Sequence, residues 1–206
     1  MSFIILQNFT LYIQVVFGLL PLGVLLFTRK KFNLEIICLL ILSVLTTIIL
    51  IVIKRFYHNN HAVFNAYAIG ELVFLTIYFY RTIGNRFLSK LILGMAVVLG
   101  GIFMWEMNRT SSLEVSLLTQ IAYNIISCVL FFIASLQSNN VSSPMHKTQV
   151  YYTLTLFLYS SFSLMFFFFI DHLMIIGAWS IHNIVESLTK LFIAYAFWKL
   201  PKTTHY

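Results

Sequence analysis

Seven long apolar runs alternate with short polar connections along the chain. Apolar residues occupy every side of these runs, and a bilayer core about 30 Å thick needs about 20 such residues in a helix. A membrane strand would show about 10 residues of alternating polarity, a pattern that these runs lack. The pattern therefore predicts an all-α fold, a polytopic bundle of seven transmembrane helices. The predicted spans lie near 7–27, 35–53, 62–80, 88–105, 114–136, 150–170 and 173–198.

The connections differ in how clearly they mark the ends of the spans. The first is strongly basic, Arg29-Lys30-Lys31, whereas only Asp171 and His172 separate the sixth span from the seventh. In the first span the basic residues follow the apolar run, while a signal peptide would carry them before it. We therefore expect the first span to be retained as a helix.

Composition strengthens the assignment to the membrane. Of the 206 residues, 60% are hydrophobic and 9% are charged, whereas soluble domains carry about 25% charged residues. Three prolines and eight glycines leave little chain for a flexible linker, so we expect residues 1–206 to form a single domain. Cys38 and Cys128 lie inside apolar runs and form no metal-binding spacing, which favours a packing role for both.

The distribution of basic residues predicts the orientation. Cytoplasmic connections are enriched in Lys and Arg, and an N-terminus outside places nine of these residues inside and three outside. The inner group is Arg29, Lys30, Lys31, Arg81, Arg86, Lys90, Lys147, Lys199 and Lys202, and the outer group is Lys54, Arg55 and Arg109. The net charge of +7 is then a topology signal and does not indicate nucleic-acid binding. We predict a bacterial cytoplasmic membrane as the location, with lipid as a partner and oligomers compatible with the sequence.

Two predicted spans carry charge deep in the membrane. Glu71 lies ten residues before Arg81. Lys190 lies nine residues before Lys199, which is about 13 Å at the helical rise of 1.5 Å per residue. That depth exceeds what a lysine reaches comfortably by extending towards the membrane surface. An interior partner or a water-filled cavity is therefore expected at both positions.

The seventh span places His182, Glu186 and Lys190 four residues apart, on one face of a helix. We predict a polar site between the third and seventh helices that transports or senses a small solute or ion. Its predicted residues are Glu71, His182, Glu186, Lys190, Asn65 and Asn183. Because Glu71 and Lys190 lie at matching depths, we also expect Lys190 to be shared between Glu186 on its own helix and Glu71 across the bundle.

A structural interpretation competes with the site. Glu186 and Lys190 could neutralise each other while His182 and the asparagines bond neighbouring helices, in a non-catalytic scaffold or a subunit of a larger complex. The sequence contains no phosphate-binding loop and no nucleophile elbow, so it gives no support for kinase, nucleotide-hydrolase or serine-hydrolase chemistry. It therefore favours a non-enzymatic function and names no cofactor.

Another alternative rests on the spacing of His182 and Glu186, one helical turn apart. This spacing resembles the seventh-helix motif of the alkaline-ceramidase and adiponectin-receptor superfamily. The resemblance implies an intramembrane metal-dependent hydrolase with His182 and Glu186 as metal ligands, although that family has two histidines there. The remaining ligands would come from His58, His61, His172 or Glu71.

The last alternative is a retinal protein. Glu186 stands four residues before Lys190, which in turn stands nine residues before a basic terminus. This arrangement resembles the surroundings of the Schiff-base lysine in microbial rhodopsins and implies a retinal-binding seven-helix protein. The sixth span, "YYTLTLFLYSSFSLMFFFFI", lacks the tryptophan and proline of that family.

Two spans resemble each other. "ELVFLTIYFYR", residues 71–81, and "KLFIAYAFWK", residues 190–199, share a deep charge, a leucine, an aromatic-rich run and a basic end. This likeness indicates two parallel three-helix repeats joined by the fourth span, an arrangement known in transporters. Sugar-exporting seven-helix proteins have that layout, but their Pro-Gln signature is absent from this sequence.

The orientation can be tested with reporter fusions. A reporter placed after Tyr206 is expected in the cytoplasm, and one inserted between Glu106 and Ser112 is expected outside, because the inner connections hold most of the basic residues. The activity of a reporter that works on only one side of the membrane measures both positions. The opposite pattern would invert the predicted topology.

Overall fold

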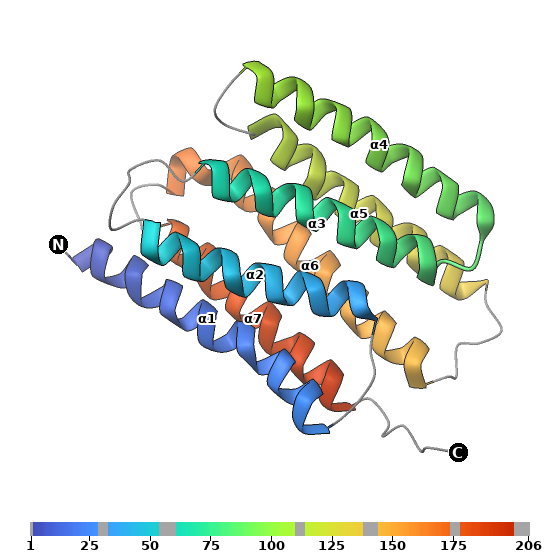
Figure 1. Ribbon diagram of the computed structural model, residues 1–206, viewed down its shortest axis with the longest axis horizontal. Coiled ribbons are helices and arrows are strands. Elements are labelled where there is room, and N and C mark those ends of the chain that lie inside the picture. Colours follow the sequence, from blue (N-terminus) through green and yellow to red (C-terminus); the bar gives the residue numbers. More distant parts are fainter. Residues whose placement is uncertain are drawn as a thin grey trace.

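The structure, a computed structural model, describes residues 2–28, 33–53, 61–109, 114–137, 144–173 and 178–199. These residues form seven α-helices and so confirm the predicted all-α fold (Figure 1). The helices are α1 (Ser2–Thr28), α2 (Leu34–Ile53), α3 (His61–Thr82), α4 (Arg86–Arg109), α5 (Glu114–Leu136), α6 (Pro144–Leu173) and α7 (Ala178–Lys199).

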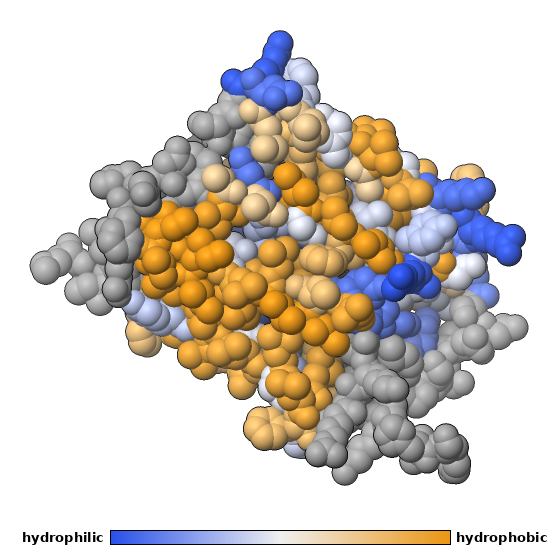
Figure 2. All heavy atoms as spheres, viewed as in Figure 1, coloured by the Kyte–Doolittle hydropathy of each residue, from blue (hydrophilic) through white to orange (hydrophobic). Residues whose placement is uncertain are grey.

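Six of these helices, α1 to α6, contain a segment long and apolar enough to cross a bilayer. The seventh, α7, has 22 residues, about 33 Å at 1.5 Å per residue, but it carries Glu186, Lys190 and Lys199. Hydrophobic side chains form a broad band across the middle of one face of the molecule, and strongly hydrophilic ones gather towards helix ends (Figure 2). This surface is suited to contact with lipid.

The predicted break at Asp171 and His172 is wrong. Helix α6 continues through both residues and ends at Leu173. Its 30 residues extend over about 45 Å, more than the hydrocarbon core requires. A helix of that length can carry polar residues on an end that projects beyond the core, so polar residues need not mark a chain break.

The helices pack as a ring of six with one helix outside it. Neighbours around the ring are α1, α2, α3, α5, α6 and α7, and α7 closes the ring against α1. Helix α4 packs on α3 and α5 from the outside, at the edge of the molecule in Figure 1. In this order α3 and α7 stand opposite each other, so their inner faces look across the ring interior.

Polar side chains within the helices are satisfied mainly by local backbone groups. Thr47, Thr76 and Ser187 each donate a hydrogen bond to the carbonyl four residues earlier, at 2.6–2.9 Å. At the start of α4, Asn85 Oδ1 accepts hydrogen bonds from the backbone N–H groups of Phe87 and Leu88. Such bonds allow hydroxyl and amide groups to lie within a bilayer, where water is absent.

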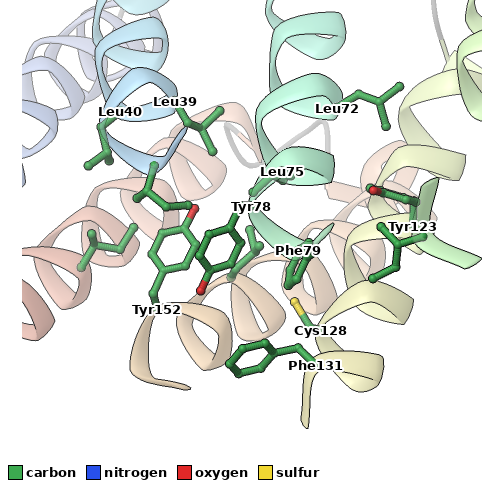
Figure 3. Packing of buried hydrophobic residues seen from close by; sticks show 14 of the residues in the cluster. Leu39, Leu40, Leu72, Leu75, Tyr78, Phe79, Tyr123, Cys128, Phe131 and Tyr152 are labelled. Atoms are coloured by element: carbon green, nitrogen blue, oxygen red, sulfur yellow. The ribbon is translucent and has the colours of Figure 1, made fainter. Parts of the chain in front are cut away.

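The apolar core is concentrated in the half of the ring that contains the end of α3 and the start of α6. Tyr78 on α3 is fully buried, and its ring meets that of Tyr152 on α6 edge to face, with centroids 5.3 Å apart. Phe79 and Phe131 add further fully enclosed rings (Figure 3). The core therefore closes the ring interior at this end.

Close packing of α1 on α2 requires glycine at position 18. A Cβ atom added to Gly18 would lie 2.7 Å from Cγ2 of Val44, and a β-branched valine in a helix cannot rotate away easily. Gly18→Ala is therefore expected to lower the free energy of unfolding by about 1–3 kcal/mol. Thermal unfolding in detergent measures this loss.

Two controls accompany that variant. Gly94→Ala on α4 should have little effect, because no atom lies within 4 Å of its added Cβ. The double variant Gly18→Ala/Val44→Ala should lose less than the sum of its two single variants, because the alanine at position 44 removes the clash. Additive losses would show that the two residues do not constrain each other.

Candidate functional site in the membrane interior

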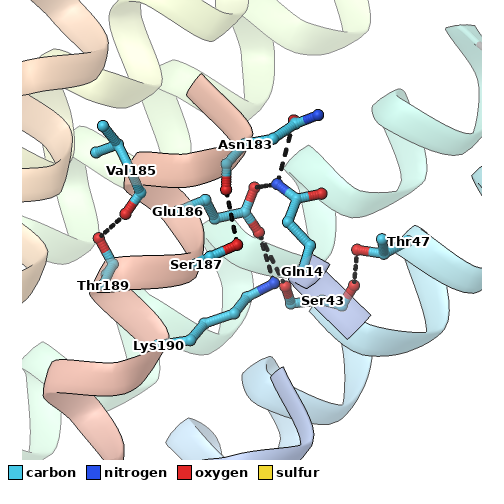
Figure 4. Close-up of polar contacts among 9 residues, drawn as sticks. All are labelled: Gln14, Ser43, Thr47, Asn183, Val185, Glu186, Ser187, Thr189 and Lys190. Atoms are coloured by element: carbon cyan, nitrogen blue, oxygen red, sulfur yellow. Dashed lines mark hydrogen bonds and ion pairs between the residues drawn. The ribbon is translucent and has the colours of Figure 1, made fainter. Parts of the chain in front are cut away.

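The carboxylate of Glu186 on α7 is the centre of a polar cluster between α1, α2 and α7. Lys190 Nζ lies 2.7 Å from Glu186 Oε1, one turn further along the same helix. Gln14 Nε2 on α1 donates a 2.6 Å hydrogen bond to Glu186 Oε2. Ser43 Oγ on α2 donates to Oε1 at 3.4 Å. Both carboxylate oxygens are thus bonded, and Figure 4 shows the donors converging from three helices.

Two neutral side chains extend the cluster along α1 and α7. Gln14 Nε2 also donates to Asn183 Oδ1 at 3.2 Å. Asn183 Nδ2 in turn donates to Thr10 Oγ1 at 3.1 Å. All three of these side chains are buried, so the contact between α1 and α7 is joined by a continuous chain of amide and hydroxyl groups.

Lys190 is buried beside Gly18 of α1. Its side chain is only 5% exposed, and its Cδ and Nζ would each be 3.6 Å from a Cβ atom added to Gly18, which is ordinary van der Waals contact. The lysine therefore packs against α1 at this glycine. Burying an ammonium group in the membrane is costly unless it is paired, and the contact with Glu186 supplies the opposite charge.

Glu71 belongs to a second cluster. It lies on α3, and Asn124 Nδ2 on α5 donates a hydrogen bond to Glu71 Oε1 at 3.3 Å. One turn closer to the end of α3, the hydroxyl oxygens of Thr76 and Tyr123 are 2.7 Å apart. These contacts join α3 to α5, on the other side of the ring from the Glu186 cluster.

The predicted sharing of Lys190 between Glu186 and Glu71 is not found. Among the described residues, Lys190 forms its ion pair with Glu186, and the other ion pair joins Arg81 to Glu35. The depth estimate placed both charges correctly near the middle of their helices. However, α3 and α7 face each other across the ring without packing together, which keeps the lysine on the α1 side.

His182 contacts aromatic rings. Its ring centroid is 5.9 Å from that of Tyr159 and 5.3 Å from that of Phe166. No three His, Cys, Asp or Glu side chains come together within the described part of the chain. His58 and the side chains of His61 and His172, the other candidate metal ligands, lie outside the described residues.

Several polar side chains near the two clusters are only partly buried. Glu186 keeps 22% of its side-chain area accessible. Four other residues, Tyr67, Glu71, Tyr159 and His182, are likewise neither fully buried nor exposed. Tyr67 on α3 and Tyr159 on α6 lie within electrostatic range of both Glu71 and Glu186. Asn65, the remaining predicted site residue, is half-buried on α3.

A separate cavity of about 240 Å³ lies at the turn between α3 and α4. Tyr80, Arg86 and Lys90 are among its lining residues, and all three are exposed. This hollow is therefore a feature of the surface near the end of α3. It is distinct from the interior around Glu186.

The structure adds site residues that the sequence analysis did not propose. Thr10, Gln14 and Ser43 contribute hydroxyl or amide groups to the Glu186 cluster, and Asn124 contributes to the Glu71 cluster. The available signal was weak: each is a neutral polar residue inside an apolar run. Such residues are common in membrane helices, and their spacing does not tell which helix they face.

In comparisons with known proteins, no family model, no curated protein and no solved structure matches this chain. Its class therefore follows from its own residues. A ring of helices, six of the seven helices apolar enough to span a bilayer, encloses paired charges and bonded amides. These features define an integral membrane protein with a polar interior.

The ion pair can be tested by a double-mutant cycle. Lys190→Met and Glu186→Gln should each lower the free energy of unfolding by about 3–5 kcal/mol, because each disrupts a buried charge pair. The double variant should lose much less than their sum, because both charges are then absent. Thermal unfolding in detergent measures the three losses. Lys90→Met, at an exposed position, serves as the control with an expected change within about 0.5 kcal/mol.

Proposed function

We propose that this membrane protein recognises a small polar solute or ion inside its helix ring, for transport or sensing. The proposal rests on one observation, which is that the Glu186 carboxylate is bonded on both oxygens and still partly accessible. Its carboxylate is held by donors from α1, α2 and α7, yet 22% of its side chain stays accessible. A group with only a structural role gains nothing from this accessibility, whereas a group that meets a solute requires it.

The distribution of polar and apolar residues indicates from which end of the helix ring a solute would enter. The enclosed polar groups lie from the middle of α3 and α7 towards the beginnings of these helices, at Tyr67, Glu71, His182 and Glu186. The opposite half is filled by the apolar core around Tyr78. A solute would thus enter near the start of α3 and α7 and stop at the core, which would have to open for passage.

The orientation determines which compartment supplies the solute. We propose that α7 crosses the membrane with the other six helices, with the N-terminus outside as the basic residues predict. The polar half then faces the outside, and the apolar core lies towards the cytoplasm. A bacterial cytoplasmic membrane stays the predicted location. The reporter fusions after Tyr206 and between Glu106 and Ser112 test this arrangement.

We also propose the parallel repeat of α1–α3 and α5–α7. The order of neighbours supports it: α1 contacts α2 and α2 contacts α3, as α5 contacts α6 and α6 contacts α7. The contact of α3 with α5 corresponds in the same way to that of α7 with α1. Parallel repeats require α1 and α5 to cross in the same direction. The repeat also requires three crossings between the α4–α5 connection and the C-terminus. If reporters between Glu106 and Ser112 and after Tyr206 lie on the same side of the membrane, the parallel repeat is excluded.

A scaffold is the second candidate, and the bonds of Gln14 favour it. One amide group joins α1 to both Asn183 and Glu186, which is the use of polar residues expected of helix packing in membranes. A scaffold needs no water in the ring interior. Access of water to the interior therefore distinguishes the two functions.

Thiol labelling measures that access. In a background with Cys38 and Cys128 replaced by Ala, we expect Tyr67→Cys and Tyr159→Cys to react with a small water-soluble methanethiosulfonate in membranes. Both positions retain accessible area in the polar half. The reaction should be faster by about 10-fold or more than at Leu75→Cys, which replaces a fully buried residue and whose thiol would be largely un-ionised.

A further control is needed for thiols that face the bilayer and are reached through the lipid. Val73→Cys on α3 replaces an exposed apolar residue that should face the bilayer, so it should react slowly with the charged reagent and readily with a lipid-soluble maleimide. If positions 67 and 159 react no faster than position 75, the interior is dry and the scaffold is favoured. The stability of each variant in detergent shows whether it is folded.

A further inference from the structure

The contact between α3 and α5 contains an unusual set of oxygen atoms. Gln120 and Asn124 lie four residues apart on α5, so they share a face of that helix. Each is only 3% exposed. Asn124 Nδ2 donates to Glu71 Oε1 at 3.3 Å, and the amide of Gln120 also lies near the Glu71 carboxyl group.

The carbonyl oxygens of these two amides have no hydrogen-bond donor. Gln120 Oε1 and Asn124 Oδ1 are fully buried and unpaired among the described residues. A buried polar atom without a partner costs about 1–3 kcal/mol, and side-chain oxygens inside membrane helices normally bond to another helix. Asn124 presents its amide nitrogen to Glu71, and rotation of an amide group exchanges its nitrogen and oxygen. Two unpaired amide oxygens on residues next to one carboxyl group thus indicate that the site accepts a positively charged species.

Charge balance at this depth leads to the same conclusion. Two ion pairs join described residues of this ring, Glu35 with Arg81 and Glu186 with Lys190, and Glu71 belongs to neither. Glu71 is the eleventh residue of α3, about 15 Å from its start. A carboxylate near the middle of a bilayer is costly without a counter-charge.

We propose that Glu71, Gln120 and Asn124 bind a monovalent metal cation of the size and hardness of sodium. Carboxylate and amide oxygens are the ligands that hard cations prefer. One carboxylate is neutralised by one positive charge, whereas a divalent ion would leave an excess charge inside the membrane. A proton would occupy only one oxygen and leave another amide oxygen unpaired.

This cation site shares no residue with the Glu186 cluster. Glu71 contacts α5, and Glu186 contacts α1 and α2. The cation site can therefore be present even if no solute binds at Glu186, and the reverse also holds. If both sites are occupied, the cation would stand across the ring interior from the solute.

The test is thermal unfolding of the full-length protein in detergent at constant pH. The unfolding midpoint is measured as sodium chloride replaces choline chloride at constant total salt. Because a ligand that binds only the folded state stabilises it, the midpoint of the wild type should rise with sodium and then saturate. Equilibrium binding of radioactive sodium to the same preparation should give one site per chain.

Five variants assign the effect to its residues. Glu71→Gln should abolish the sodium-dependent rise, and Asn124→Leu and Gln120→Leu should each raise the half-saturating sodium concentration at least tenfold. Cys128→Ala, which replaces a buried residue of α5 that has no side-chain oxygen, should respond as the wild type does. The Glu186→Gln variant should also keep the sodium response, so failure of the solute site would not remove it.

Three results would overturn the proposal. One is a midpoint that depends on pH but is the same in sodium and choline, which would mean that a proton neutralises Glu71. The second is a sodium response that survives in Glu71→Gln, which would place the cation elsewhere. The third is the absence of bound radioactive sodium from folded wild-type protein, which decides the matter even if the variants are too unstable to measure.

Discussion

The ion pair between Glu186 and Lys190 constrains the arrangement of the surrounding helices. Neither group is easily left alone in a medium that lacks water, and the seventh helix carries both, one turn apart. The carboxylate then needs more donors than one ammonium supplies, and Gln14 and Ser43 bring α1 and α2 to it. Glycine at position 18 lets α1 approach Val44 of α2 closely, and it lies beside the lysine.

The polar groups of the helix ring form two separate clusters, one around Glu71 and one around Glu186. The carboxyl groups of Glu71 and Glu186 stand on opposite walls of the ring, each with its own amide partners. Neither depends on the other for a hydrogen bond. The two clusters thus have separate partners on facing helices, and Tyr67 and Tyr159 lie within electrostatic range of both carboxyl groups.

The sequence predicted the helices well because membrane spans depend on a local property, about 20 consecutive apolar residues. It also placed Glu71 and Lys190 near the middle of their helices, since that position follows from spacing along the chain. It predicted the pairing of Lys190 with Glu186, four residues away on the same helix, but failed for the contact with Glu71, because neighbours in a bundle are set by packing between distant segments. The break at Asp171 failed for a related reason: polarity marks the end of the hydrocarbon core, and a helix can continue beyond it.

The position of α7 after the other six helices has a consequence for biogenesis. Because chains emerge N-terminal end first, α1, α2 and α3 are made before the helices that complete the ring, and α7 is the last of the seven to be synthesised. The helix that carries Glu186 and Lys190 thus reaches the bilayer when its partner on α1 is already in place. Until it docks, Glu186 and Lys190 are four residues apart on one segment and supply each other's counter-charge, so α7 brings its own neutralisation to the step of insertion.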